Sequence, residues 1–267
     1  MRVALVVEYD GTEYHGFQYQ ENAPSIQAEL ESAIEKLTKE KVRIKGAGRT
    51  DTGVHATGQV IAFDTNSTLP IGTLVSGLNH YLPEDIAIRG AYGAPEGFDP
   101  RRDALSRRYR YTIHNTATRS PMSRRTALLI DEPLDVAAMD GAARRFEGVH
   151  DFARFAGSLE DGEASTVRRI DSASVWKEGD TVYFEVTGNA FLPHQVRRMA
   201  GALVDVGKGR LTGTDIGEML EGTAGNVVAN TLPPQGLCLM EVTYEDFPPK
   251  NGEGYDTTSK VVQNTGI

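Results

Sequence analysis

A repeated order of strands and helices is the feature that most constrains the fold of this chain. In residues 1–104, the hydrophobic pattern reads strand, helix, strand, strand, helix, strand, beginning with VALVVEY at 3–9. The same order returns in residues 105–247, from RRYRYTIH at 107–114 to GLCLMEVTY at 236–244. Two such units predict an α+β fold with two tandem split β-α-β-β-α-β (ferredoxin-like or RRM-like) units. Their antiparallel sheets are expected to join across a central active-site cleft.

The pattern also predicts the domain organisation. We expect an N-terminal α+β domain at 1–104 and a C-terminal α+β domain at 105–247. Residues 248–267 are polar with Pro and Gly, a composition that predicts a disordered tail. The chain has no run of 18 apolar residues, and its first residues do not resemble a signal peptide. We therefore expect a soluble, cytoplasmic protein without membrane contact.

Positive charge is concentrated in one segment of an acidic chain. The chain carries a formal net charge of −9 over 267 residues. Residues 101–125 hold eight arginines and one acid, a local charge of +7, which leaves −16 for the rest of the chain. A charge run is usually a solvated face, and that reading stays open. Arginine suits bidentate phosphate contacts, however, and aromatic residues alternate with it in RRYRY, so the segment favours RNA binding.

The sequence gives little support to disulfide or metal chemistry. The single cysteine, Cys238, lies in an apolar stretch, so we expect a buried strand residue and no intrachain disulfide. No Cys-x-x-Cys motif occurs and the histidines are scattered. They are His15, His55, His80, His114, His150 and His194. We expect no metal site.

The segment GAGRTDTGVHATGQ, residues 46–59, is the candidate functional loop. It is not a phosphate-binding P-loop, because a strand rather than a helix follows Gly53. It also fails the G-x-G-x-x-G pattern, since Asp51 occupies the place of the third glycine. What remains is a carboxylate, Asp51, on a glycine-rich loop beside the guanidinium of Arg49. Asp51 could equally cap a turn and pair with Arg49, and the loop alone does not decide.

Five motifs, in order along the chain, together resemble the tRNA pseudouridine synthase family that acts on positions 38 to 40. They are EYDGTEYHGFQ (8–18), AGRTDTGVHATGQV (47–60), LNHYLP (78–83), SRRYRY (106–111) and NAFLPHQVRRMAGAL (189–203). The similarity extends from Val3 to about Tyr244. It departs from the family at Phe17, where tryptophan is common, and at Pro193, where histidine is often found. These departures weaken the transfer of RNA contacts but not of the catalytic residue.

The resemblance implies an isomerase, an intramolecular transferase that needs no cofactor and no metal. Asp51 matches the family's catalytic aspartate. The family reaction breaks the N1–C1′ bond of uridine, turns the uracil while it stays bound, and joins C5 to C1′. The carboxylate can add to C6 of the ring or act at the ribose, and the sequence does not choose between these routes. The family further implies tRNA, through its anticodon stem-loop, as the partner, and a homodimer.

Further residues take expected roles from the same match. Arg197 corresponds to the arginine that pairs with the catalytic aspartate and would offset the burial of its charge; a helix-surface charge is the alternative. Arg49 is expected to help displace the target nucleotide and occupy its place. Tyr109 corresponds to the tyrosine that stacks on the target base, although a core aromatic would look the same.

Strand geometry places Tyr109 and Tyr111 on one side of their strand and Arg108 and Arg110 on the other. We expect Arg108 and Arg110, together with Arg107, to contact phosphate.

His55, like His194, could touch RNA, but a hydrogen-bonded structural histidine is the commoner role. Two other functions stay open. One is a catalytically silent RNA-binding module, and the other is a hydrolase that releases uracil with the same carboxylate.

Overall fold

The computed structural model describes residues 1–158, 165–224, 229–245, 247 and 254–256. The chain forms two compact units. The first comprises Met1–Leu105 and the chain from Leu239 onward, and the second comprises Ser106–Cys238. These units place the last strand of the predicted 105–247 domain mostly with the first unit. The division into domains at 1–104 and 105–247 stays a prediction.

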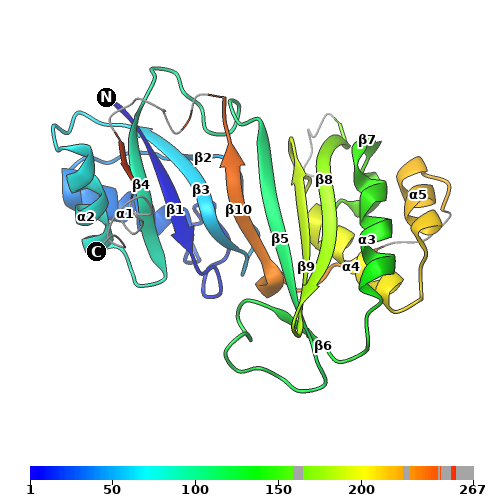
Figure 1. The fold of residues 1–267 in the computed structure, drawn as a ribbon. Coiled ribbons are helices and arrows are strands. Elements are labelled where there is room, and N and C mark those ends of the chain that lie inside the picture. The colour runs from blue at the N-terminus through cyan, green and yellow to red at the C-terminus, as the bar shows by residue number, and fades with distance from the viewer. Residues whose placement is uncertain (159–164, 225–228, 246, 248–253, 257–267) are drawn as a thin grey trace, which may run out of the picture. The chain divides into compact units, whose positions relative to one another are not determined.

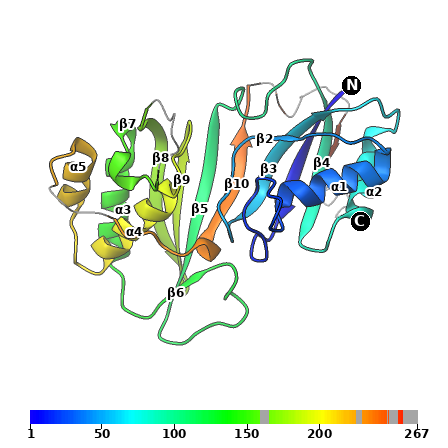
Figure 2. The same cartoon turned by 180° about the vertical axis from the view of Figure 1, so that it is seen from behind.

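The first unit contains a largely antiparallel sheet with two helices on one face (Figures 1 and 2). Its strand order is β11-β4-β1-β3-β10, and β2 pairs with β3. The elements are β1 (Arg2–Tyr9), α1 (Ile26–Thr38), β2 (Lys45–Gly46), β3 (His55–Asp64), α2 (Ile71–Tyr81), β4 (Ile86–Ala94), β10 (Leu237–Thr243) and β11 (Gly254–Asp256). Up to β4 this is the predicted order. β10 was predicted as the last strand of the second domain, and β11 was not predicted.

Helix α1 shows why these residues form helices. Ser25 has extended backbone angles and its side chain accepts a hydrogen bond from the Ala28 N–H, which is a standard N-cap. Ile26, Leu30 and Ile34 recur at helical spacing and are buried against the sheet side of the unit. The helix lies on one face of the sheet with these residues buried (Figure 2).

Strand pairing decides where the candidate loop leaves the sheet. β1 pairs antiparallel with β3, with Val7 opposite Gln59 and Tyr9 opposite Ala56. The register shifts between Val7 and Tyr9, which indicates a bulge. The loop that precedes β3 thus lies at the C-terminal end of β1.

The second unit contains a four-stranded antiparallel sheet in the order β5-β9-β8-β7, with β6 added parallel to β5. The elements are β5 (Ser106–Asn115), β6 (Leu128–Ile130), α3 (Val136–Ala143), β7 (Gly148–Asp151), β8 (Val167–Glu178), β9 (Thr181–Gly188), α4 (Gln195–Gly207) and α5 (Gly213–Glu221), with 3₁₀ helices at Arg144–Phe146, Ala153–Phe155 and Pro234–Gly236. The predicted strands and helices are present in the predicted order. The short strands β6 and β7 were not predicted.

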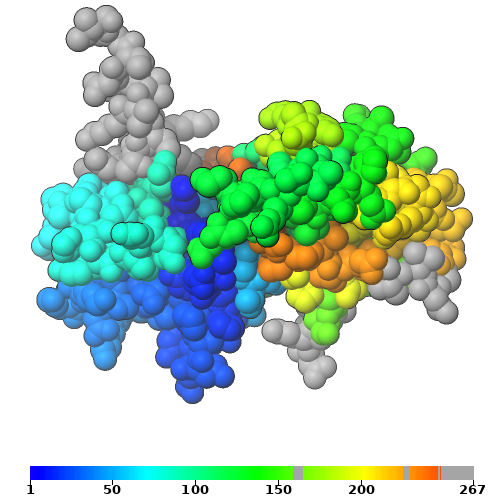
Figure 3. All heavy atoms as spheres, turned by 90° about the horizontal axis from the view of Figure 1, so that it is seen from below, coloured from blue at the N-terminus to red at the C-terminus, as the bar shows by residue number. Residues whose placement is uncertain are grey.

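The segment between β5 and β6 lies at the surface of the second unit, where it is drawn in green (Figure 3). Met122 in this segment is 93% exposed, and Arg119, Arg124 and Arg125 are exposed as well. Three of the eight arginines of the basic stretch therefore belong to a solvent-facing segment.

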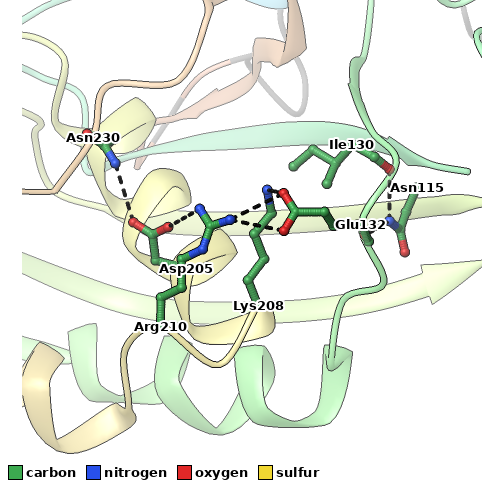
Figure 4. Close-up of polar contacts among 7 residues, drawn as sticks. All are labelled: Asn115, Ile130, Glu132, Asp205, Lys208, Arg210 and Asn230. Atoms are coloured by element: carbon green, nitrogen blue, oxygen red, sulfur yellow. Dashed lines mark hydrogen bonds and ion pairs between the residues drawn. The ribbon is translucent and has the colours of Figure 1, made fainter. Parts of the chain in front are cut away.

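A polar cluster fixes the C-terminal end of α4 (Figure 4). Glu132 accepts hydrogen bonds from Lys208 and from Arg210, and Arg210 also lies 3.7 Å from Asp205. These ion pairs and hydrogen bonds lower the pKa of Glu132, the Lys208 bond being the largest cause. Because Lys208 and Arg210 follow α4 directly, the cluster ties this helix to the segment after β6.

The tail prediction is only partly covered by the described residues. Residues 248–253 and 257–267 lie outside them. Gly254–Asp256 is not disordered but forms β11, which pairs antiparallel with residues 90–92 of β4. This pairing satisfies backbone groups that β4 would otherwise leave unpaired at the sheet edge. Every helix in the described part of the chain is too short or too polar to span a bilayer.

Candidate active site

The loop between β2 and β3 is held to the sheet at its N-terminal end. The Ala47 N–H donates to the Val60 carbonyl over 2.8 Å. The fully buried Gln59 donates through Nε2 to the Gly48 carbonyl over 3.0 Å. A buried side-chain amide that donates a hydrogen bond to the loop backbone holds that backbone in place. Gly48 and the residues that follow it therefore have a defined position.

The segment 10–17 packs along the same loop. The Phe17 N–H donates to the Thr50 carbonyl over 3.0 Å, and the Gly53 N–H donates to the Tyr14 carbonyl over 3.2 Å. Tyr14 is itself anchored, because its hydroxyl donates to Asp85 Oδ1 over 2.7 Å. Burial and this carboxylate raise the pKa of Tyr14 well above its ordinary value, so the hydroxyl stays a donor. Segment 10–17 is thus packed against the candidate loop.

Two glycines allow this close approach. A Cβ at Gly11 would lie 2.0 Å from the Val54 carbonyl oxygen, and a Cβ at Gly16 would lie 2.8 Å from that of Thr50. Gly16 also has φ +94°, in the region that favours glycine. Any larger residue at either position would push on the backbone of the candidate loop.

The three central residues of the loop face different surroundings. Thr50 is buried, and its Oγ1 lies 2.8 Å from the Tyr9 hydroxyl. Asp51 is half-buried, and its carbonyl accepts from the Val54 N–H over 3.1 Å. Arg49 is exposed. The inward Thr50 side chain anchors the turn, so the position of Asp51 is set by the fold before any substrate binds.

His55, predicted to contact substrate, is buried at 7% exposure. Its Nδ1 lies 3.1 Å from the Gly11 backbone nitrogen and 3.1 Å from Asp10 Oδ1. A ring nitrogen that accepts from Gly11 cannot at the same time donate to Asp10. These contacts favour the structural alternative, and an RNA contact by His55 stays a prediction.

The second unit holds Tyr109 and Arg197 on neighbouring elements. Tyr109 is 8% exposed and its ring meets that of Phe191 edge-to-face, with centroids 5.2 Å apart. Arg197 lies in the first turn of α4, and its Nε donates to the Leu232 carbonyl over 2.7 Å. Its charge lies close enough to Tyr111 to oppose the rise in the Tyr111 pKa that burial causes. Phe191 and Arg197 both belong to the segment NAFLPHQVRR, which therefore borders Tyr109 and Tyr111.

Backbone strain marks the start of α4. His194 has φ +60°, an uncommon conformation for a residue other than glycine. The segment is held by Gln195, which is fully buried and whose Oε1 accepts from the Leu192 N–H over 2.8 Å. Strain of this kind tends to persist where the surroundings over-determine it, often near functional sites. The strained residue directly precedes the helix that carries Arg197.

The alternation predicted for β5 is confirmed, but the arginines are not simply solvated. Tyr109 and Tyr111 are buried on one face, and Arg108 and Arg110 are half-buried on the other. Glu185 Oε2 accepts from Arg108 over 3.1 Å and from Arg110 over 2.8 Å. Strand pairing places Arg110 directly opposite Glu185. Both arginines therefore have an acidic partner in the sheet, and their expected phosphate contacts stay a prediction.

Arg107 differs from its neighbours. It is 8% exposed and donates to the Asn189 carbonyl over 2.6 Å. A buried guanidinium bound to a backbone carbonyl is suited to holding NAFLPHQVRR against β5. This contact gives Arg107 a structural role.

The predicted site residues thus fall into two sets. Arg49 and Asp51 share the loop of the first unit, and Tyr109 and Arg197 lie on adjacent elements of the second. That the two sets meet around one substrate stays a prediction.

Across the part of the chain that the structure describes, no three His, Cys, Asp or Glu side chains gather as a metal site would require. The hydrogen bond between the Tyr9 and Thr50 hydroxyls was not predicted. The two residues are 41 positions apart, and the sequence offers only the place of Thr50 between Arg49 and Asp51 as a hint.

Comparison with known proteins gives one consistent result. A sequence profile of the family described as tRNA pseudouridine synthase matches residues 5–101 and 142–245. The chain is 46% identical over 261 residues to tRNA pseudouridine synthase A of Myxococcus xanthus, covering 97% of this chain and 98% of that protein. It is 45% identical over 242 residues to the protein of that name from Pelobacter propionicus, covering 91% and 99%. A third such protein, from Geotalea uraniireducens, is 44% identical with the same coverage.

Proposed function

Because the chain belongs to the tRNA pseudouridine synthase family, whose members are isomerases, we propose that it converts uridine to pseudouridine in tRNA. We further propose that the targets are one or more of positions 38, 39 and 40 in the anticodon stem-loop. The observation that carries the proposal is the similarity at 46% identity over nearly the whole of both chains. Action in the cytoplasm and as a homodimer belongs to the same proposal.

Asp51 is the proposed nucleophile. Its carboxylate attacks either C6 of the uracil or the ribose, the N1–C1′ bond breaks, and the uracil turns within the site. C5 then bonds to C1′, and the bond between Asp51 and the substrate breaks, which regenerates the carboxylate. The proton on C5 is lost and N1 gains a proton, so the product is an isomer of the substrate. The hydrogen bonds that fix Gly48, Thr50 and Gly53 support this role, because a nucleophile held in one position loses little entropy on reaction.

Three residues are proposed to assist Asp51. Arg197 pairs with the carboxylate and offsets the loss of water around it. Tyr109 stacks on the uracil and limits water access to C1′, where hydrolysis would leave an abasic site. Arg49, exposed on the loop, occupies the space vacated when the target nucleotide is extruded. Recognition of several neighbouring positions fits reading of RNA shape and backbone rather than base edges.

The test uses the purified full-length protein and unmodified tRNA transcripts, without added metal or nucleotide. Pseudouridine is mapped by chemical probing, and the RNA mass and free uracil are measured in parallel. We expect pseudouridine within positions 38–40 at unchanged RNA mass. Release of free uracil would instead identify a hydrolase, and binding without any product would identify a silent RNA-binding module.

A further inference from the structure

A pocket of about 620 Å³ lies in the first unit beside the candidate loop. Gly48 and Arg49 of the loop form part of its wall, and Phe17 and Ile44 contribute apolar surface. Its size is in the usual range for pockets that bind small groups. Of the residues given roles in the proposed function, Arg49 lines the pocket, whereas Asp51, Tyr109 and Arg197 do not.

The pocket is lined by more positive than negative charge. Its cations are Lys45, Arg49, Arg101 and Arg102, and its one carboxylate is Asp99, a local charge of +3. The chain as a whole carries −9. A concave surface with such an excess of guanidinium groups attracts anions, and phosphate above all.

Asp99 pairs with one of these cations, Lys45, and holds the turn that carries the two arginines. Its side chain is 16% exposed, and Oδ2 lies 3.1 Å from Lys45 Nζ. Oδ1 accepts from the backbone N–H groups of Arg101 and Arg102 over 3.0 and 3.2 Å. Burial alone would raise the pKa of Asp99, but the Lys45 bond and these two backbone bonds lower it overall. The carboxylate is thus occupied by Lys45 and by backbone.

Hydrogen bonds hold the backbone of the turn that carries Arg101 and Arg102. The Asp99 N–H donates to Asp103 Oδ2 over 2.8 Å, and the Asp103 N–H donates to the Asp99 carbonyl over 3.0 Å. The buried Tyr244 hydroxyl donates to the Pro100 carbonyl over 2.7 Å. Both arginines are exposed at the surface of this turn. A fixed backbone lowers the entropy lost when such side chains bind a ligand.

We propose that this pocket binds a phosphodiester group of the RNA strand that carries the target uridine, with Arg101 and Arg102 as its ligands. The inference rests on the proposed function. The argument for RNA rather than a free anion is Arg49, which lines the pocket and stands two residues from Asp51. Two residues span at most about 7 Å, so an occupant lies close to the reacting nucleotide. The contact positions the strand and takes no part in the chemistry.

The first experiment compares Arg101→Gln/Arg102→Gln with a control, Lys36→Gln/Lys41→Gln. The control removes the same charge from exposed residues of the same unit that do not line the pocket. Kd for tRNA is measured against salt concentration, and the single-turnover rate is measured at saturating tRNA. Urea unfolding verifies that both variants fold.

We expect the pocket variant to bind tRNA roughly tenfold more weakly, with a slope of log K against log salt reduced by about 2. The control should retain the wild-type slope to within about 0.5. The rate at saturating tRNA should fall far less than the affinity. A pocket variant with the affinity and salt slope of the control would overturn the inference and leave the proposed function intact.

The second experiment locates the phosphate. Anticodon stem-loops are prepared with a single neutral methylphosphonate linkage, moved one position at a time past the target uridine. Wild-type protein should lose affinity strongly at one or two linkages near the target, and the Arg101→Gln/Arg102→Gln protein should lose nothing further there. Equal losses in both proteins at every linkage would refute the contact. Wild-type protein that forms no pseudouridine in unmodified RNA would refute the proposed function and this inference together.

Discussion

Gly16 connects a single backbone angle to the candidate active site. Its φ of +94° and its approach to the Thr50 carbonyl mean that this position tolerates no side chain without movement. Thr50 lies next to Asp51, so movement of its carbonyl displaces the proposed nucleophile. A displacement of about 1 Å near reacting atoms can lower a rate by about a hundredfold.

We predict that Gly16→Ala lowers pseudouridine formation by at least about tenfold, because the new Cβ pushes on the loop backbone. Gly97→Ala is the matched control, since Gly97 has φ +84° but no atom within 4 Å of an added Cβ. Both variants should lose about 1–2 kcal/mol of stability from the backbone angle alone. Single-turnover assays and urea unfolding separate the two effects. Equal activity in both variants would show that the contact with Thr50 does not matter.

At the scale of elements, β5 shows where sequence reasoning succeeded and where it stopped. Alternation placed Tyr109 and Arg110 on opposite faces correctly, because a strand has a period of two. The partner of Arg110, Glu185, lies 75 residues away, and single-sequence patterns do not specify which strands pair. The sequence therefore predicts an RNA-binding surface for the basic stretch. In the structure, Arg108 and Arg110 share the Glu185 carboxylate within the sheet, and their phosphate contacts stay a prediction.

We predict that Arg110→Gln destabilises the protein by about 1 kcal/mol, because the residue loses its ion pair and its cation–π contacts. Its guanidinium carbon lies 5.3 Å from the ring centroids of Trp176 and Tyr183. Glu185→Gln should show a similar loss, and a double-mutant cycle by urea unfolding should show coupling of about 0.5 kcal/mol or more. Strictly additive losses would contradict a working pair. An unchanged salt dependence of tRNA binding in Arg110→Gln would assign the arginine to the sheet alone.

Asp140 ties α3 to β8 and gives a pH prediction. Its Oδ1 accepts from the Val175 N–H over 2.9 Å, and Arg144 pairs with Oδ2. The backbone bond from Val175 is the largest cause of the lowered Asp140 pKa. Partial burial would raise this pKa, but the Val175 bond and the Arg144 ion pair together outweigh it. A carboxyl whose pKa is lower in the folded state stabilises the protein above its unfolded pKa. This stability is lost as the pH falls through the folded pKa.

We therefore expect Asp140→Asn to reduce stability at pH 7, and the difference from wild type to shrink as the pH falls below about 4. The measurement is the free energy of unfolding in urea between pH 3 and pH 7. Asp131→Asn, at an exposed residue nearby, is the control and should keep the wild-type pH dependence. A difference that grows on acidification would contradict the sign of the argument.

For the whole molecule, the order of strands and helices was predictable because the long elements carry clear periodicity. The missed strands β6, β7 and β11 have three or four residues each, too few for a period to show. The sequence motifs predict Asp51, Arg49, Tyr109 and Arg197 as site residues, and these roles stay predictions. The structure adds the hydrogen bonds that hold the backbone at Gly48, Thr50 and Gly53. The basic pocket was not predictable from the sequence, because Lys45 and Arg101 are far apart in the chain. They line one pocket because Lys45 pairs with Asp99 in the turn that carries Arg101.

The most direct test of the account is pseudouridine formation by Asp51→Asn, measured in single turnover with unmodified tRNA beside wild type. Asparagine keeps the size of the side chain but removes the ionised oxygen that attacks the substrate. We predict tRNA affinity close to that of wild type and no detectable pseudouridine. Pseudouridine formed by Asp51→Asn at the wild-type rate would contradict the assignment of Asp51 as nucleophile.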